Sequence, residues 1–218
     1  MKFIKVSSIK PVVDYLVETL NRHLAQGERV LWLLSGGSFI PIEVEISKRL
    51  SAPTDKLIVG LVDERYGRLG HTDSNAKQLA KHGFKFGIEP VLKDEPISRT
   101  IIDFSNFLEH NLKIADFKLG LFGIGPDSHI AGIKPKSPAV DAVGLVSHYD
   151  WEDYDRITMT FAALRQLDMA VAYLAGDTKK EAIERLQVTE PKDITPSQIL
   201  RELKQVIIFN DRISKEVL

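Results

Sequence analysis

The feature that most constrains this chain is the regular alternation of short apolar runs with segments of helical periodicity. Residues 11–26 place apolar side chains at helical spacing, and residues 29–34 then form an apolar run of strand length. Strands separated by helix-length segments predict an α/β fold, in which helices cover both faces of a mostly parallel central sheet. We expect helices at 11–26, 41–50, 74–82, 103–112 and 179–186, and strands at 29–34, 56–62, 118–122, 143–148, 156–161, 169–175 and 205–209.

Length and charge limit the function classes. With 218 residues, 44% of them hydrophobic, the chain can bury the core of one large domain, so we expect a single α/β domain over residues 1–218. Lys and Arg number 29 against 30 for Asp and Glu, which gives no overall attraction to nucleic acid or to an anionic membrane. No apolar run approaches the roughly 20 residues that span a bilayer, and the N-terminus lacks a signal-peptide pattern. Cysteine is absent, which excludes disulfides and thiolate nucleophiles. These observations favour a cytoplasmic protein with a small-molecule partner.

Glycine or charged residues follow four of the predicted strands. The four segments are Ser35–Pro41, Asp63–Gly67, Gly123–His129 and Gly176–Lys180. In open parallel sheets, ligands bind beyond the carboxyl ends of the strands, because loops and helix N-termini converge there. We therefore expect one site at this edge of the sheet.

The loop after the strand at 29–34 suits an anion. Its two glycines let the backbone approach a ligand closely, and the helix that begins near Pro41 directs its positive dipole end at the loop. The alternative is a tight turn with a serine as helix cap.

Charged residues near the same edge also suit an anion. Lys179 lies in the first turn of a predicted helix, where a cation suits a bound anion. The alternative for each charged residue is a solvated side chain or an internal salt bridge. The candidate phosphate-binding residues are Ser35, Gly36, Gly37, Ser38, Arg65, Arg156 and Lys179.

His129 is the candidate base. It lies two residues after Asp127 at a glycine-rich strand end, and a neutral imidazole can accept a proton from water or from a sugar hydroxyl. Asp63 adds a carboxylate that could take a proton or orient a histidine. The sequence contains neither a Walker A loop nor a G-x-G-x-x-G, H-E-x-x-H or G-x-S-x-G motif. General acid/base chemistry without a metal or cofactor is therefore the favoured interpretation, although a lone histidine is more often structural.

Five ordered segments carry a family resemblance. They are SGGSFIP, LVDERYG with HTDSN, LGLFGIGPDSHIAG, RITMTFAAL and YLAGDTKKEAI, and the match runs roughly from Val12 to Asp211. Together they resemble the superfamily of 6-phosphogluconolactonases and glucosamine-6-phosphate isomerases (deaminases). The resemblance implies a Rossmann-like three-layer sandwich. The DER segment followed by Ser74 and Asn75 is similar to the lactonases, whereas the isomerases carry D-E-Y there and an acid at the position of Lys134.

The resemblance implies hydrolysis of 6-phosphoglucono-δ-lactone to 6-phosphogluconate, a step of the pentose phosphate pathway. His129 would deprotonate the attacking water and help to protonate the leaving ring oxygen, Asp127 would support it, and the phosphate would bind the residues named above. Two alternatives stay open: an isomerase, in which Asp63 would take the proton from C2, and a sugar-phosphate-binding protein without catalysis. The implied partner is a small sugar phosphate, and the implied assembly is a monomer or a small homo-oligomer.

The chain departs from the lactonase motif D-G-H-T-A-S-L-F-P at several positions. Ser128, Ile130, Gly132 and Lys134 stand where that motif has glycine, threonine, serine and phenylalanine. If the glycine position needs a positive φ, Ser128 brings backbone strain to the site. Lys134 adds a positive charge that could bind a second anionic group.

Overall fold

Two sheets organise the protein, and the computed structural model describes residues 1–217, so that residue 218 of the expected domain lies outside the described residues. The strands are β1 (Lys2–Lys5), β2 (Val30–Leu34), β3 (Leu57–Leu61), β4 (Asp63–Arg65), β5 (Phe117–Phe122), β6 (Val146–Tyr149), β7 (Arg156–Met159), β8 (Met169–Leu174), β9 (Val206–Asn210) and β10 (Lys215–Glu216). The larger sheet has the order β10-β1-β9-β8-β5-β2-β3, and all its pairs are parallel except β1 with β10. The smaller sheet, β4-β7-β6, is antiparallel.

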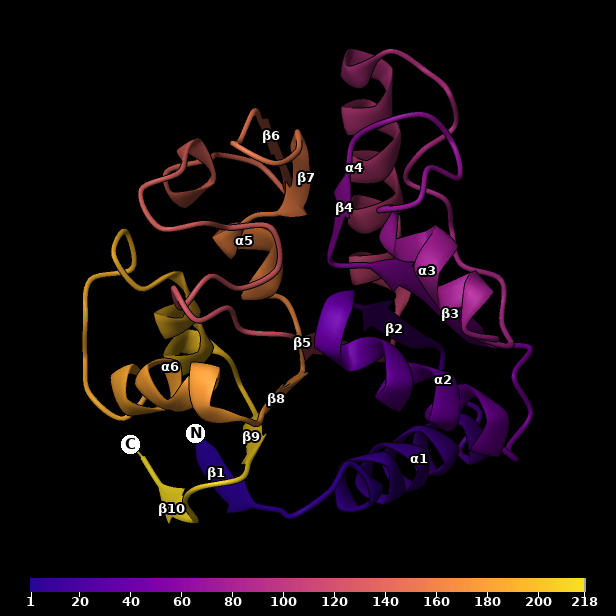
Figure 1. Cartoon of the computed structure of the whole chain (residues 1–218). Coiled ribbons are helices and arrows are strands. Elements are labelled where there is room, and N and C mark those ends of the chain that lie inside the picture. Colours follow the sequence, from indigo (N-terminus) through magenta and orange to yellow (C-terminus); the bar gives the residue numbers. More distant parts are fainter. Residues whose placement is uncertain (218) are drawn as a thin grey trace.

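Helices lie on both sides of the larger sheet, as Figure 1 shows for α1 and α2 on one side and α6 on the other. The helices are α1 (Lys10–Ala25), α2 (Ile40–Arg49), α3 (Asn75–Lys81), α4 (Ile97–Ile114), α5 (Phe161–Leu164) and α6 (Lys180–Arg185). Every residue of β2 is buried, as is typical of a parallel strand covered on both faces. The predicted α/β fold with a mostly parallel central sheet is confirmed.

The predicted strands at 143–148 and 156–161 belong to the smaller sheet rather than to the parallel one. They form the antiparallel pair β6 and β7, which lies above the larger sheet in Figure 1. β7 is shorter than predicted, because Thr160 accepts a hydrogen bond from the N–H of Ala163 at 3.3 Å and so caps α5. α4 begins at Ile97, directly after Pro96 and earlier than the predicted residue 103.

The strand order places the predicted site segments side by side. β3, β2, β5 and β8 are consecutive neighbours in the larger sheet and run parallel, so their carboxyl ends lie at one edge. β4 follows β3 almost at once and pairs with β7, which brings a second sheet to the same edge. Within residues 1–217, no helix has the length and apolar character needed to cross a membrane.

Candidate active site

A pocket of about 220 Å³ lies where these segments meet. Its lining comes from the loops after β2, β5 and β8, from β4 and β7, and from the start of α3. The structure therefore brings together all the predicted site residues except Asp127, which lies beside the pocket in contact with His129. The predicted residues in the lining are Ser35, Gly36, Gly37, Ser38, Asp63, Arg65, His129, Arg156 and Lys179.

The loop of residues 35–38 requires both of its glycines. A Cβ atom on Gly36 would lie 2.0 Å from Oδ1 of Asn75, so no larger residue fits against α3. Gly37 has a φ of 61°, in the left-handed region that favours glycine. A short 3-10 turn at Gly37–Phe39 then leads into α2, and the first N–H groups of such a helical segment have no partner within it. The loop can therefore offer backbone donors to an anion.

Glu43 of α2 fixes the start of this loop from inside the protein. Its Oε1 accepts a hydrogen bond from the N–H of Ser35 at 2.7 Å, and its side chain is fully buried. Burial raises the pKa of Glu43 well above its ordinary value; the hydrogen bond from Ser35 opposes this shift, and the charge of Asp63 adds to it. The acid is thus held where its neutral form is favoured.

Arg65 of β4 and Arg156 of β7 lie directly opposite each other on neighbouring strands of the smaller sheet. Nη1 of Arg65 donates to the carbonyl oxygen of Asp73 at 2.6 Å, and Nη2 of Arg156 donates to Oδ2 of Asp153 at 2.6 Å. Among residues 1–217, neither Nε atom has a hydrogen-bond partner, and both are buried. The two guanidinium groups are thus anchored to the protein and lie at the pocket with donors to spare.

Asp63 presents a carboxylate to the pocket from β4. Burial raises the pKa of Asp63, and the neighbouring positive charges of Arg65 and Arg156 only partly oppose that shift. A carboxyl group in this position can change its protonation state closer to neutral pH than an exposed aspartate.

Glu64, the next residue, has a structural role. Strand side chains alternate in direction, and Glu64 turns to the start of α3. Its carboxylate accepts hydrogen bonds from the hydroxyl of Ser74 at 2.9 Å and from the backbone N–H of Arg65, Asn75 and Ala76 at 2.7–3.1 Å. Burial raises the pKa of Glu64, while these hydrogen bonds oppose the rise. Glu64 therefore joins β4 to the helix beside it.

The turn that carries His129 is tightly constrained. Ser128 has a φ of 66° and Ala131 a φ of 50°, so two residues with a Cβ adopt the left-handed conformation. The φ of Ser128 is positive, so the condition under which backbone strain was expected at this position is met. A Cβ on Gly125 would lie 2.1 Å from Nδ1 of His129, because the imidazole packs directly over the glycine.

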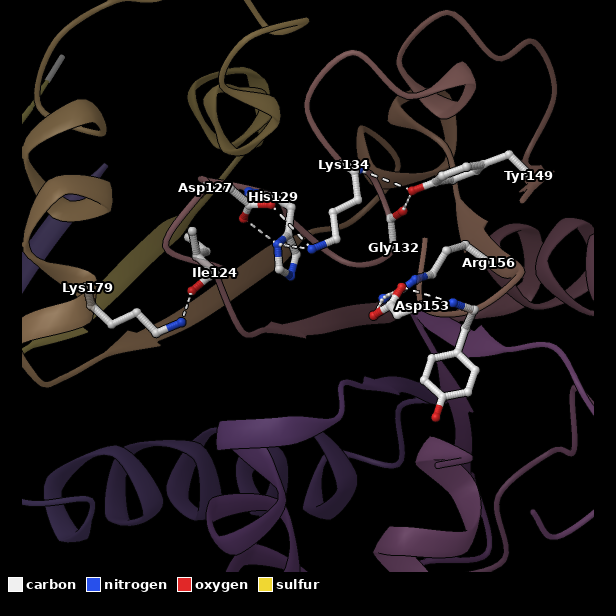
Figure 2. A network of polar contacts seen from close by, with 10 residues as sticks. Ile124, Asp127, His129, Gly132, Lys134, Tyr149, Asp153, Arg156 and Lys179 are labelled. Carbon is white, nitrogen blue, oxygen red and sulfur yellow. Dashed lines mark hydrogen bonds and ion pairs between the residues drawn. The ribbon is translucent and has the colours of Figure 1, made fainter. Parts of the chain in front are cut away.

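His129, Asp127 and Lys134 form a cluster at the edge of the pocket (Figure 2). Nδ1 of His129 lies 2.5 Å from Oδ1 of Asp127, and the ammonium nitrogen of Lys134 lies 3.3 Å from Oδ2 of the same carboxylate. Partial burial alone would raise the pKa of Asp127, but the hydrogen bond and charge of His129, with a smaller effect of Lys134, hold it well below its usual range. Lys134 is not among the residues that line the pocket. Its ammonium group forms an ion pair with Asp127, so it does not provide an open subsite for a second anion.

Lys179 lies on the other side of His129 from Arg156 (Figure 2). Its ammonium group donates to the carbonyl oxygen of Ile124 at 2.5 Å. Burial lowers the pKa of Lys179, the charge of Asp127 opposes the shift, and Lys134 adds to it. The pocket therefore has cationic groups on both sides of one imidazole.

Asn75 is a pocket residue that was not among the predicted site residues. Its amide nitrogen donates to the carbonyl oxygen of Asp63 at 3.0 Å, and its Oδ1 is buried without a hydrogen-bond partner in the described part of the chain. Asn75 belongs to the HTDSN segment of the family resemblance. The sequence spacing, however, did not indicate that α3 begins against the loop of residues 35–38.

The fold and the site define an α/β protein whose pocket, at the carboxyl edge of a parallel sheet, combines a glycine loop, three cationic side chains and a histidine paired with an aspartate. The family comparison agrees with this class. The chain belongs to the family of glucosamine-6-phosphate isomerases and 6-phosphogluconolactonases, whose family model matches residues 5–208.

Individual relatives lie within the same family. The chain is 27% identical over 186 residues to a 6-phosphogluconolactonase of Caulobacter vibrioides, covering 78% of each protein. It is 30% identical over 173 residues to a probable 6-phosphogluconolactonase of Dictyostelium discoideum, covering 72% of this chain and 73% of the relative. The crystal structure of a 6-phosphogluconolactonase from Thermotoga maritima superposes with a TM-score of 0.83 at 21% identity, covering 95% of this chain and 97% of that one. This structural likeness supports the assigned fold.

Proposed function

We propose that this protein hydrolyses 6-phosphoglucono-δ-lactone to 6-phosphogluconate. The observation that carries the proposal is the contact between His129 and Asp127 at 2.5 Å, beside a pocket lined by a glycine loop and three cationic side chains. The names of the curated relatives support the same reaction. Within the family, lactone hydrolysis is favoured over isomerisation because Lys134 stands where the isomerases have an acid.

The phosphate of the substrate binds the loop of residues 35–38 together with the cationic side chains around it. A sugar phosphate carries close to two negative charges at neutral pH, and backbone N–H groups at a helix start stabilise such a group. Lys179 supplies a point charge, while Arg65 and Arg156 supply planar donors suited to phosphate or carboxylate oxygens. Binding of the phosphate fixes the sugar ring in front of His129.

His129 acts as a general base and then as a general acid. With Nδ1–H donated to Asp127, the lone pair of Nε2 accepts a proton from water as the water oxygen attacks the lactone carbonyl carbon. The tetrahedral intermediate collapses, the bond from the carbonyl carbon to the ring oxygen breaks, and the imidazolium returns its proton to that oxygen. The product is a ring-opened hydroxy acid that ionises to 6-phosphogluconate.

The proposal is tested by following freshly generated 6-phosphoglucono-δ-lactone against its spontaneous hydrolysis. We expect the wild-type protein to accelerate the reaction, and to act far less well on glucono-δ-lactone, which lacks the phosphate. Turnover of glucosamine 6-phosphate instead would support the isomerase alternative. Binding of 6-phosphogluconate without any turnover would support the binding-protein alternative and contradict the proposal.

Lys179→Met tests the phosphate contact within the same assay. We expect KM for the phosphorylated lactone to rise by about tenfold, since one charge-assisted contact is lost, with little change for the phosphate-free lactone. Lys180→Met is the matched control, because Lys180 is exposed and does not line the pocket. Its ammonium nitrogen lies 4.0 Å from Oε1 of Glu184. Equal effects of the two variants would contradict a phosphate contact by Lys179.

A further inference from the structure

Lys134 makes contacts that the proposed reaction does not use. Its ammonium nitrogen lies 3.1 Å from Nδ1 of His129 and 3.3 Å from Oδ2 of Asp127, while Nδ1 lies 2.5 Å from Oδ1 of Asp127. The side chain of Lys134 is only 16% exposed. Three groups thus share one small space, and two of them are formally charged.

The single proton on Nδ1 decides how these contacts are arranged. Nδ1 cannot donate to Asp127 and accept from Lys134 at the same time, because a ring nitrogen carries either a proton or a lone pair. The shorter contact is to the carboxylate, so the proton lies on Nδ1 and points to Asp127. Lys134 then bonds to the other carboxylate oxygen, and Nε2 keeps the free lone pair.

We propose that Lys134 is a positioning residue that balances the charge of Asp127, so that His129 stays a neutral base with Nε2 unprotonated. An unbalanced carboxylate next to an imidazole stabilises the imidazolium, which cannot accept a proton from water. The ammonium ion of Lys134 offsets that effect and disfavours a second positive charge 3.1 Å away. This role of Lys134 in catalysis rests on the proposed function, lactone hydrolysis.

Other charged groups near the cluster belong to different elements. Asp63 on β4 interacts electrostatically with both His129 and Lys134, and Lys179 interacts with Asp127 and Lys134. Asp63 favours a charged imidazole and Lys179 disfavours one. Of these groups, Lys134 alone contacts both members of the His129–Asp127 pair in the described residues, so its removal changes their charge balance most directly.

The test is the pH dependence of kcat/KM for the lactone in wild type, Lys134→Met and Lys134→Arg, each corrected for spontaneous hydrolysis. We expect the acid limb of Lys134→Met to move to higher pH by about one unit, and that of Lys134→Arg to stay near wild type because the charge is kept. Lys136→Met is the matched control, since Lys136 is exposed two residues further on. A uniform loss of rate with an unmoved acid limb would show a merely structural role and overturn the proposal.

A second measurement needs no turnover. The imidazole Cε1–H resonance of His129, assigned by its loss in His129→Gln, is titrated by NMR in the same variants without substrate. We expect its midpoint to rise in Lys134→Met alone; an unchanged midpoint would overturn the proposal. If the midpoint rises while wild type fails to accelerate lactone hydrolysis, the charge balance stands and the proposed function fails.

Discussion

Ser128 combines two unfavourable features at the edge of the site. Its φ of 66° is costly for a residue with a Cβ, and its hydroxyl is buried without a hydrogen-bond partner among residues 1–217. Its carbonyl oxygen accepts from the N–H of Ser197 at 3.1 Å, which ties this turn to the 3-10 segment at Pro196–Glu202. The surrounding contacts therefore hold Ser128 in this conformation.

Ser128→Gly should stabilise the protein. We expect the free energy of unfolding to rise by about 1 kcal/mol, because relief of the left-handed strain and of the buried hydroxyl exceeds the added flexibility of glycine in the unfolded chain. Urea unfolding measures the change. Ser128→Ala keeps the strain and removes only the hydroxyl, so it separates the two causes; a destabilised Ser128→Gly would contradict this account.

Most of the residues that line the candidate pocket could be named from the sequence, because glycines and charges interrupt the apolar pattern where strands end. The position of Lys134 against His129 could not. The turn around His129 contains two left-handed residues, Ser128 before it and Ala131 after it, and neither residue type signals that conformation. The unpartnered amide oxygen of Asn75 was missed for a similar reason, since it depends on where α3 meets a distant loop.

At the scale of elements, the joint between β4 and α3 determines where Arg65 and Asn75 lie. Glu64 accepts three backbone hydrogen bonds and one from Ser74, whose hydroxyl also accepts from the N–H of Lys77 at 3.2 Å and caps the helix. The sequence indicated that Asp63 and Glu64 stood together at a strand end. It did not indicate that one would face the pocket and the other the helix.

Glu64→Gln should weaken this joint. The amide replaces one carboxylate oxygen with a donor that faces other donors, so we expect a loss of about 2 kcal/mol in the free energy of unfolding at neutral pH. Ser74→Ala should cost about 1 kcal/mol, as for other lost helix caps. Thermal or urea unfolding ranks the two variants. A Glu64→Gln protein as stable as wild type would show that these hydrogen bonds do not hold α3 in place.

Periodicity predicted most helices and strands, since their apolar faces pack on one sheet. Periodicity did not assign β6 and β7 to a second sheet, because the sequence pattern of a short apolar strand is the same in a parallel and in an antiparallel sheet. The terminal strands β1 and β10 also escaped prediction, since they are short and are defined by pairing with distant parts of the chain, β1 with β9 and β10 with β1.

At the scale of the whole molecule, buried acids make stability depend on pH. Glu43 has a pKa raised well above its ordinary 4.5, mainly by burial. A carboxyl whose pKa is higher in the folded state contributes stability below its unfolded pKa, and this contribution is lost as the pH rises through the folded value. Glu43 therefore opposes folding increasingly as the pH rises above about 4.5.

Glu43→Gln should remove this dependence. Glutamine keeps an oxygen for the N–H of Ser35 and cannot ionise. We expect the unfolding free energies of variant and wild type to be similar near pH 4.5, and the difference to grow in favour of the variant as the pH rises above that value. Denaturant unfolding at several pH values measures the difference, in which the contributions of the other carboxylates cancel. A difference that stays constant with pH would contradict the expectation.

The convergence of four strand ends on one pocket follows from the parallel order of β3, β2, β5 and β8, and the edge rule for parallel sheets predicted it. Buried apolar residues from both sheets belong to one core cluster, which holds the two sheets together around the pocket. The single domain, the cytoplasmic location and the monomeric or small homo-oligomeric assembly stay predictions.

The most direct test of the central claim is kcat/KM for 6-phosphoglucono-δ-lactone in wild type and His129→Ala, with binding of 6-phosphogluconate measured in parallel. A general base contributes about 10²–10⁴-fold, so we predict a loss of that size with product binding largely retained. A His129→Ala protein within a few-fold of wild type would contradict the assignment of His129 as the base.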